Sequence, residues 1–446
     1  MASEKTLIND LTHGPLTKQI MLFSVPLVLG NLLHTLYNLV DMAIVGQFVG
    51  REGLSAVATS GQLTILLYCL GIGLGSGGQI LVAQQVGAGD REGVRKTVGT
   101  FFTFNILLAL VVTTLAIIFN KPMLRLLNTP AEAWQDAVEY MFWCCLGIPF
   151  TYMNGGLSGL MRGMGDSKHP TYFVAAAAIA NIFLDLLFVA GFGLRAKGAA
   201  MATAIAQLIG AAACVLYMYR HRVELDFDFK RESFRMDRRI LSTMVRLAAP
   251  LAVQTIAINI SMLFVNAWIN AYGVVASAAN GVGSKLNSLA TVITNAMQSA
   301  AATFTGQNIA ARKLDRVHRT MSAAVICCLC FWVLSVAMCV FLPRQVFGLF
   351  TRDADVLDIA PSYMKVQIVM YLTFALMSTP LGFINGVGHV NLNLILALAD
   401  GIVARIGLCL LLSSVLDIGP YAYWWSNALA GYIINAHQDK PTTDIN

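Results

Sequence analysis

Residues 17–46 read TKQIMLFSVPLVLGNLLHTLYNLVDMAIVG, and this stretch decides the fold class. It is almost entirely apolar, and its formal charges are confined to Lys18 near the start and Asp41 near the end. A helix crosses the hydrocarbon core of a bilayer with about 20 predominantly apolar residues. The stretch therefore predicts a transmembrane helix that carries one carboxylate inside the membrane.

The rest of the 446-residue chain repeats this pattern, since hydrophobic residues make up 57%, charged residues 12%, and the mean hydropathy is +0.66. A soluble chain carries about 25% charged residues, so a soluble enzyme, a disordered chain and a coiled coil are all disfavoured. Apolar runs between polar, Gly or Pro breaks predict an all-α polytopic membrane protein with twelve transmembrane helices. The predicted ranges are 17–46, 54–85, 95–119, 136–160, 170–192, 198–219, 240–270, 275–308, 320–342, 362–384, 392–416 and 420–434.

The last predicted helix, 420–434, is unusually short. It has about 15 residues, fewer than the about 20 that a span needs, and the tail 437–446 is too polar to extend it. Either this helix crosses the membrane incompletely, or the chain is a truncated or altered version of a longer one.

The chain also repeats itself after 223 residues. The stretch 83–97 lines up with 306–320, Tyr140-Met141 with Tyr363-Met364, and three glycines of each half coincide. We therefore expect an N-terminal lobe over 1–220, a cytoplasmic linker over 221–239 and a C-terminal lobe over 240–446. Six helices in each lobe return the chain to its starting side, so the lobes should be related by a pseudo-two-fold along the membrane normal, as in secondary transporters.

Positive charges orient the predicted helices. The net charge is +6, and with the N-terminus inside, 19 Lys and Arg fall on cytoplasmic segments against 7 on the opposite side. This asymmetry predicts that both termini are cytoplasmic. Residues 1–15 are polar and lack the apolar core of a signal peptide, so the first helix is expected to be retained.

Four polar residues are predicted to meet at one depth of the N-terminal lobe. Asp41 and Asp185 each lie roughly 10 Å below the outer membrane surface, at 1.5 Å per helical residue. Asn181 precedes Asp185 by four residues and shares its helix face, while Thr203 enters from the same side. Two adjacent carboxylates form a candidate proton carrier, and the same set of oxygens also suits Na⁺ as a metal ligand set. The alternative is that each is a satisfied structural group.

Other charged residues within the predicted spans are secondary candidates. Asp400 lies five residues before Arg405, which predicts either an internal structural ion pair or a coupling role. Lys285 is expected to face an aqueous cleft or to snorkel. His34, Tyr37 and Asn38 share a helix face with Asp41, and His34 is more often a packed side chain than a proton relay.

Catalytic and nucleotide-binding motifs are absent from the sequence. The glycine-rich run 71–78 lies in an apolar helix with no preceding strand, so it indicates close helix packing or a helix break instead of a phosphate loop. The nine cysteines have no zinc-site spacing and are interpreted as small buried side chains. We expect neither an enzyme nor a bound cofactor.

Several stretches together resemble the multidrug and toxic compound extrusion (MATE) family, prokaryotic branch, over about residues 10 to 432. They are Tyr37-Asn38-Leu39-Val40-Asp41, Gln84-Gln85-Val86-Gly87-Ala88-Gly89-Asp90, Arg162-Gly163-Met164-Gly165-Asp166 and Asn181-Ile182-Phe183-Leu184-Asp185.

The resemblance implies a multidrug efflux antiporter in the bacterial inner membrane that exports organic, often cationic and lipophilic, compounds in exchange for H⁺ or Na⁺. It implies cation coupling at Asp41, Asn181, Asp185 and Thr203. It also implies a substrate cavity lined by Tyr37, Asn38, Tyr140 and Asn154. Some branches place carboxylates in the seventh and tenth helices, where this chain has none. A monomer suffices for the two-lobe design.

Two alternatives stay open. A flippase for a lipid-linked sugar would need a cleft rich in Lys and Arg, for which Lys285 and Arg405 are the good candidates. A membrane-embedded enzyme or receptor would need a catalytic pair near the bilayer surface or a ligand-binding domain. The sequence does not name the substrate or choose between H⁺ and Na⁺.

Overall fold

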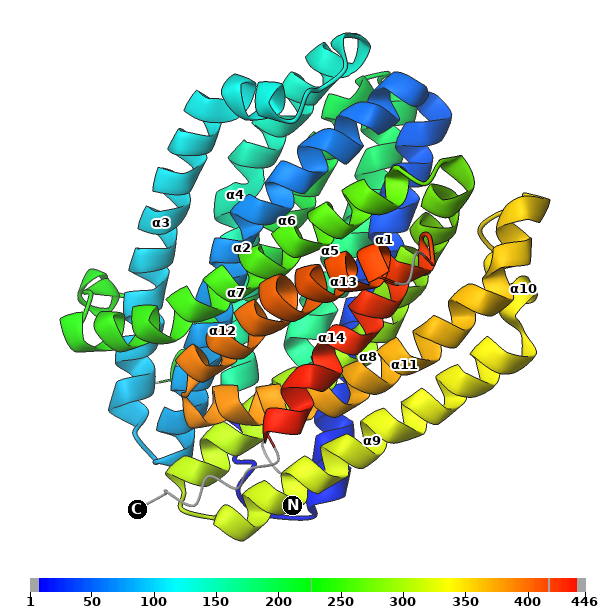
Figure 1. Cartoon of the computed structure of the whole chain (residues 1–446). Helices are drawn as coiled ribbons and strands as arrows, with labels where there is room; N and C mark the ends of the chain where they lie inside the picture. The colour runs from blue at the N-terminus through cyan, green and yellow to red at the C-terminus, as the bar shows by residue number, and fades with distance from the viewer. Residues whose placement is uncertain (1–7, 226, 416–417, 439–446) are drawn as a thin grey trace. The chain divides into compact units, whose positions relative to one another are not determined.

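The computed structural model describes residues 8–225, 227–415 and 418–438, and the regular structure in these ranges is helical throughout (Figure 1). Contacts divide the chain into two compact units. We call the part up to Val253 together with Gly306–Leu314 the first unit, and Gln254–Thr305 together with the part from Asp315 onward the second unit.

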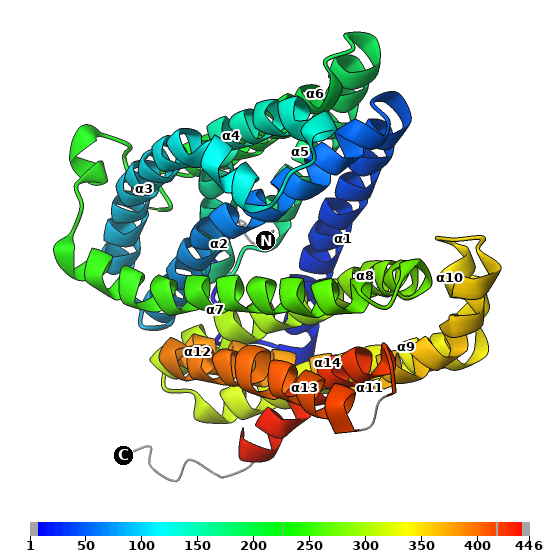
Figure 2. The ribbon, with the colours of Figure 1, turned by 45° about the horizontal axis from the view of Figure 1, so that its top comes forward.

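Six long helices build most of the first unit. They are α1 (Leu16–Phe48), α2 (Arg51–Gly87), α3 (Arg91–Leu126), α4 (Trp134–Gly163), α5 (Lys168–Asp185) with its continuation η2 (Leu186–Gly191), and α6 (Arg195–Arg220). Two short 3₁₀ turns, η1 (Ala131–Ala133) and η3 (Arg231–Phe234), lie in the connections. Within this unit α4 packs between α2 and α6, and α1 packs on α5 (Figure 2). Leu110, Val111 and Ile118 on α3 are exposed apolar side chains, as expected of a face that meets lipid.

The second unit holds the remaining helices. They are most of α7 (Arg238–Asn270) and α8 (Val274–Ala310), then α9 (Leu314–Phe341), the short α10 (Pro343–Gly348), α11 (Ala354–Val387), the continuous run of α12 (Val390–Leu398), η4 (Ala399–Ala404) and α13 (Arg405–Val415), and α14 (Tyr421–Gln438). Its core gathers Phe347, Tyr363 and Trp424 around α11 and α14.

All twelve predicted ranges overlap a helix of the structure, and the fold class is confirmed as an all-α polytopic membrane protein. Among the described residues, nine helices are long and apolar enough to cross a membrane. The helices α4, α8 and α14 fall outside this group, so the count of twelve spans stays a prediction. The last helix, α14, has 18 residues and ends at Gln438, beyond the predicted 434.

Glycines bring helices of each unit into backbone contact. The run 71–78 lies in an unbroken α2, and a Cβ on Gly159 of α4 would lie 2.4 Å from the Gly75 carbonyl oxygen. The structure thus confirms close packing for this run. In the second unit, a Cβ on Gly382 of α11 would lie 2.4 Å from the Gln298 carbonyl oxygen of α8. Small residues permit such approaches, which gain van der Waals contact in a membrane where no hydrophobic effect operates between helices.

The segment predicted as a charged linker packs on α3. Phe227 is fully buried and stacks on Phe102 with ring centroids 6.3 Å apart. Thr103 donates a hydrogen bond of 2.6 Å to the Phe234 carbonyl, and the Asp237 N–H donates to the Thr100 hydroxyl at 3.0 Å. The linker is therefore fastened to the first unit at several points.

Candidate functional site

The four predicted coupling residues lie together in the first unit. Asp41 on α1 is 8% exposed, while Asn181 and Asp185 on α5 are 1% and 0% exposed. The carboxyl groups of Asp41 and Asp185 are close enough to interact electrostatically. The Asn181 amide donates to the hydroxyl of Thr203 on α6 at 3.3 Å. Three helices thus bring one polar cluster to the interior of an apolar bundle.

This cluster has an excess of hydrogen-bond acceptors. Asp41 Oδ1, Asn181 Oδ1 and both carboxylate oxygens of Asp185 are buried without a hydrogen-bond partner among the described residues. Burying an ionised carboxylate without compensation costs several kcal/mol. Two facing carboxylates can share a proton or coordinate a hard cation, and either would relieve this cost. The geometry is therefore that of a site for a small positive species.

The donor set distinguishes this cluster from a transition-metal site. The described part of the chain contains no group of three or more His, Cys, Asp or Glu side chains placed to hold a metal. Asn181 and Thr203 would instead complete the two carboxylates with neutral oxygens. Such oxygens suit Na⁺ without selecting it over H⁺.

The helix changes character directly after Asp185. The residues Leu186–Gly191 form a π-helical turn, which is wider than an α-turn and is frequent at functional sites. The amino-acid sequence carries no signal for this turn, because a π-turn has no characteristic composition.

A second polar chain leads away from the carboxylates. The Tyr37 hydroxyl lies near the Gln207 side chain, and Gln207 Oε1 accepts a hydrogen bond of 2.8 Å from the Asn154 amide. Tyr140 is buried within electrostatic range of Asp41. Gln207 is not among the predicted site residues, although its place four residues after Thr203 puts both on one face of α6.

The structure does not bring the remaining two predicted residues of α1 into this cluster. Asn38 and His34 are exposed, and the Asn38 amide donates to the His34 carbonyl at 2.8 Å. The His34 ring stands edge-on to Tyr37 with centroids 4.9 Å apart. The expected shared face of α1 therefore divides into a buried part with Tyr37 and Asp41 and an exposed part with His34 and Asn38.

The secondary candidates other than His34 lie in the second unit. Arg405 donates a hydrogen bond of 2.8 Å to Asp400, and the two side chains are 8% and 14% exposed. Asp400 lies within the π-helical turn η4 (Ala399–Ala404), and Arg405 follows directly after it. Lys285 is half-buried on α8.

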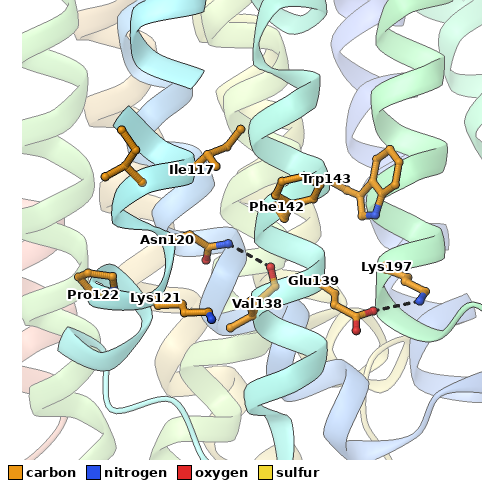
Figure 3. A pocket seen from close by; sticks show the side chains of 10 residues that line it. Ile117, Asn120, Lys121, Pro122, Val138, Glu139, Phe142, Trp143 and Lys197 are labelled. Carbon is orange, nitrogen blue, oxygen red and sulfur yellow. Dashed lines mark hydrogen bonds and ion pairs between the residues drawn. The ribbon is translucent and has the colours of Figure 1, made fainter. Parts of the chain in front are cut away.

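A separate cavity of about 540 Å³ lies between the end of α3 and the starts of α4 and α6 (Figure 3). Its polar lining includes the Glu139–Lys197 ion pair at 3.1 Å and Asn120, which donates to the Val138 carbonyl at 3.1 Å. The predicted site residues are not part of its lining.

Comparison with known families gives a match over both halves. The family profile described as MatE matches residues 26–187 and again 250–411. The first segment contains most of α1 and all of α2 to α5, and the second contains most of α7 to α13.

Curated relatives cover most of the chain. A probable multidrug resistance protein of Bacillus subtilis, YoeA, is 30% identical over 83% of this chain and 82% of its own length. The multidrug export protein MepA of Staphylococcus aureus is 23% identical over 87% of this chain and 83% of its own. A protein of Shewanella oneidensis named FAD transporter is 24% identical over 81% and 80%.

Solved structures share the fold. An outward-facing multidrug resistance MATE family transporter superposes with a TM-score of 0.90 at 22% identity, covering 98% of this chain and 97% of that chain. A crystal structure of MATE in complex with MaL6 gives the same score, identity and coverage.

Proposed function

The chain belongs to the MatE family of transporters, and from this premise we propose that it is a secondary active antiporter that exports organic compounds in exchange for H⁺ or Na⁺. The observation that carries the proposal is the cluster of four buried acceptor oxygens on Asp41, Asn181 and Asp185 without donors among the described residues. A site of this kind is stable when it holds a positive species and strained when it does not. That difference is what coupling to a cation gradient requires.

The residues of the polar cluster have different proposed roles in the transport cycle. In the outward-facing state, Asp41 and Asp185 take up H⁺ or Na⁺, and the loss of their repulsion lets α1 and α5 approach. The Asn181–Thr203 hydrogen bond carries this movement to α6, since it joins the two helices. In the inward-facing state the cation leaves and the substrate enters. The cation and the substrate must each bind the two states with different affinity, because coupling is a difference of free energies.

The substrate class follows the names of the relatives. We propose organic, often cationic and lipophilic, substrates, with Tyr37, Asn38, Tyr140 and Asn154 lining their cavity. The relative named FAD transporter extends the range of substrates to consider beyond such cations. A flippase for a lipid-linked sugar is the alternative, and Lys285 and Arg405 would then have to serve its phosphates. We place the protein as a monomer in the bacterial cytoplasmic membrane, with both termini in the cytoplasm.

Ethidium uptake into inside-out vesicles tests the proposal, with a proton gradient and a Na⁺ gradient imposed in turn. We expect uptake to follow one gradient and to be lost in Asp41→Asn. Asp358→Asn is the matched control, because Asp358 is exposed and pairs with Arg344 far along the chain from the cluster. Wild-type transport by the Asp41→Asn protein would overturn the proposed role of the cluster.

A further inference from the structure

The two halves of the chain can be aligned residue by residue at the candidate coupling site. Asn181 to Leu187 reads NIFLDLL, and Arg405 to Leu411 reads RIGLCLL, with four identities at an offset of 224. The two MatE matches, 26–187 and 250–411, have the same offset at both ends. Arg405 therefore occupies the position of Asn181, and Cys409 occupies the position of Asp185.

The offset between the halves increases by one residue between Gly388 and Arg405. Gly165 and Gly388 are 223 residues apart, so one additional residue lies between Gly388 and Arg405 in the second half. The π-helical turn Ala399–Ala404 lies in this interval. A π-turn is the usual way in which a helix takes up one extra residue.

The π-turn explains why Asp400 reaches Arg405. Side chains five residues apart on an α-helix point in directions roughly 140° apart. The wider π-turn reduces this angle, and the structure places Arg405 Nη2 2.8 Å from Asp400 Oδ2. The inserted residue thus creates a counter-ion for the arginine on its own helix.

The pair leaves much of its hydrogen-bonding capacity unused. Arg405 is buried, and its Nε and Nη1 have no partner among the described residues. Asp400 Oδ1 and Asn427 Oδ1 are also unpartnered there, and Asn427 occupies the position of Thr203 at the same offset. An arginine stays charged in any protein environment, and its planar fork matches the two oxygens of a carboxylate or phosphate.

We propose that the second unit contains a binding site of inverted charge, in which Arg405 takes a carboxylate or phosphate oxygen of the transported substrate. This inference rests on the proposed transport function and adds a substrate class to it. In the absence of such a group, Asp400 compensates the buried guanidinium. When an oxyanion binds, Nε and Nη1 of Arg405 donate hydrogen bonds to it. Asn427 on the neighbouring helix α14 then bonds the polar groups of the substrate that lie beside the oxyanion.

The test compares a cationic and an anionic probe in the same vesicles. Uptake of ethidium and of carboxyfluorescein is measured for wild type, for the Asp400→Asn/Arg405→Gln double variant and for Arg405→Lys. The double variant removes both charges together, so it does not leave one charge buried alone; Asp400→Asn keeps the side-chain shape, and Arg405→Gln shortens the side chain but keeps a polar end. Arg405→Lys keeps the charge but loses the fork.

We expect wild type to transport both probes. The double variant should lose carboxyfluorescein uptake about tenfold or more, the size expected for losing charged hydrogen bonds, and should retain ethidium uptake. Arg405→Lys should fall between the two for carboxyfluorescein alone.

A parallel fall of both probes would assign the pair a structural role and overturn the proposal. It would also be overturned if wild type neither transported carboxyfluorescein nor bound it, with binding measured by fluorescence anisotropy on purified protein. Failure of ethidium uptake under both cation gradients would instead contradict the proposed antiport function. The anisotropy measurement would still test whether the oxyanion site binds carboxyfluorescein.

Discussion

The two units pack their helices in the same way and enclose opposite chemistry. Gly159 meets a carbonyl of α2 in the first unit, Gly382 meets a carbonyl of α8 in the second, and a Cβ would lie 2.4 Å from the facing oxygen in both. Yet the first unit buries two carboxylates without cations, whereas the second buries an arginine with one carboxylate. We call these two glycine contacts, at Gly159 and Gly382, the shared frame. Because they are made by backbone atoms, they do not depend on which charged side chains each unit buries.

The largest expected effect separates the units at matched positions. Asp185→Asn should reduce cation-driven ethidium uptake on the order of 100-fold, since it removes the charge on which coupling depends. Cys409→Ser, at the corresponding position of the second unit, should leave uptake within about twofold. Both are measured in vesicles with equal amounts of inserted protein. Equal loss in the two variants would contradict the assignment of coupling to the first unit.

A change to the shared frame should affect both units alike. Gly159→Leu and Gly382→Leu each force a side chain into a backbone contact, and each should cost about 1–3 kcal/mol or more of stability. Gly155→Leu is the matched control on α4, because a Cβ there meets nothing within 4 Å. Thermal unfolding of the purified proteins in detergent would measure the three. A loss confined to one unit would show that the frame is not equivalent.

A smaller effect is expected where only the first unit has a polar bridge. Gln207→Ala should destabilise the protein by about 1–3 kcal/mol, since the buried Asn154 amide loses its hydrogen-bond partner inside the bundle. The second unit has Gly431 at the matching position, beside the Thr373 methyl group. Gln207→Glu serves as the isosteric comparison, and thermal unfolding is again the measurement. Unchanged stability in Gln207→Ala would mean that another group satisfies the Asn154 amide.

The smallest effect belongs to the exposed face of α1. Asn38→Ala should leave stability within about 0.5 kcal/mol and raise the ethidium KM about twofold to fivefold, the loss of one modest hydrogen bond to substrate. The dependence on the cation gradient should persist. Loss of that dependence would show that Asn38 acts together with Asp41 in coupling. It would contradict the division of α1 into a buried part and an exposed part.

The sequence predicts the helices and the buried carboxylates well, because hydrophobic periodicity and the free-energy cost of burying a charge determine these features. A carboxylate in an apolar helix is expensive, so Asp41 and Asp185 stood out, and a spacing of four residues joined Asn181 to them. The positions of His34 and Asn38 were not predictable in the same way, because the exposed sector of α1 depends on its neighbours. The π-turns could not be predicted either, since one extra residue in a helix leaves no local sequence pattern.

Gln207 shows a further limit of sequence reasoning. A single amide in an apolar helix is compatible with many environments, and its role depends on the Tyr37 and Asn154 side chains that approach from other helices. Only the register between helices decides whether such a residue bridges two partners.

The fastened linker has a consequence for proteolysis. Residues 221–239 include Arg222, Lys230, Arg231 and Arg235, and an unattached segment with so many basic residues would be an early target of trypsin. Here Phe227 is buried against α3, while Phe234 and Asp237 hold the backbone through hydrogen bonds. A protease binds its substrate as an extended stretch of about ten residues. The segment cannot adopt such an extended stretch while it is held on α3. Limited digestion should therefore leave the two halves in one piece, and the appearance of half-length fragments would report when the segment leaves α3.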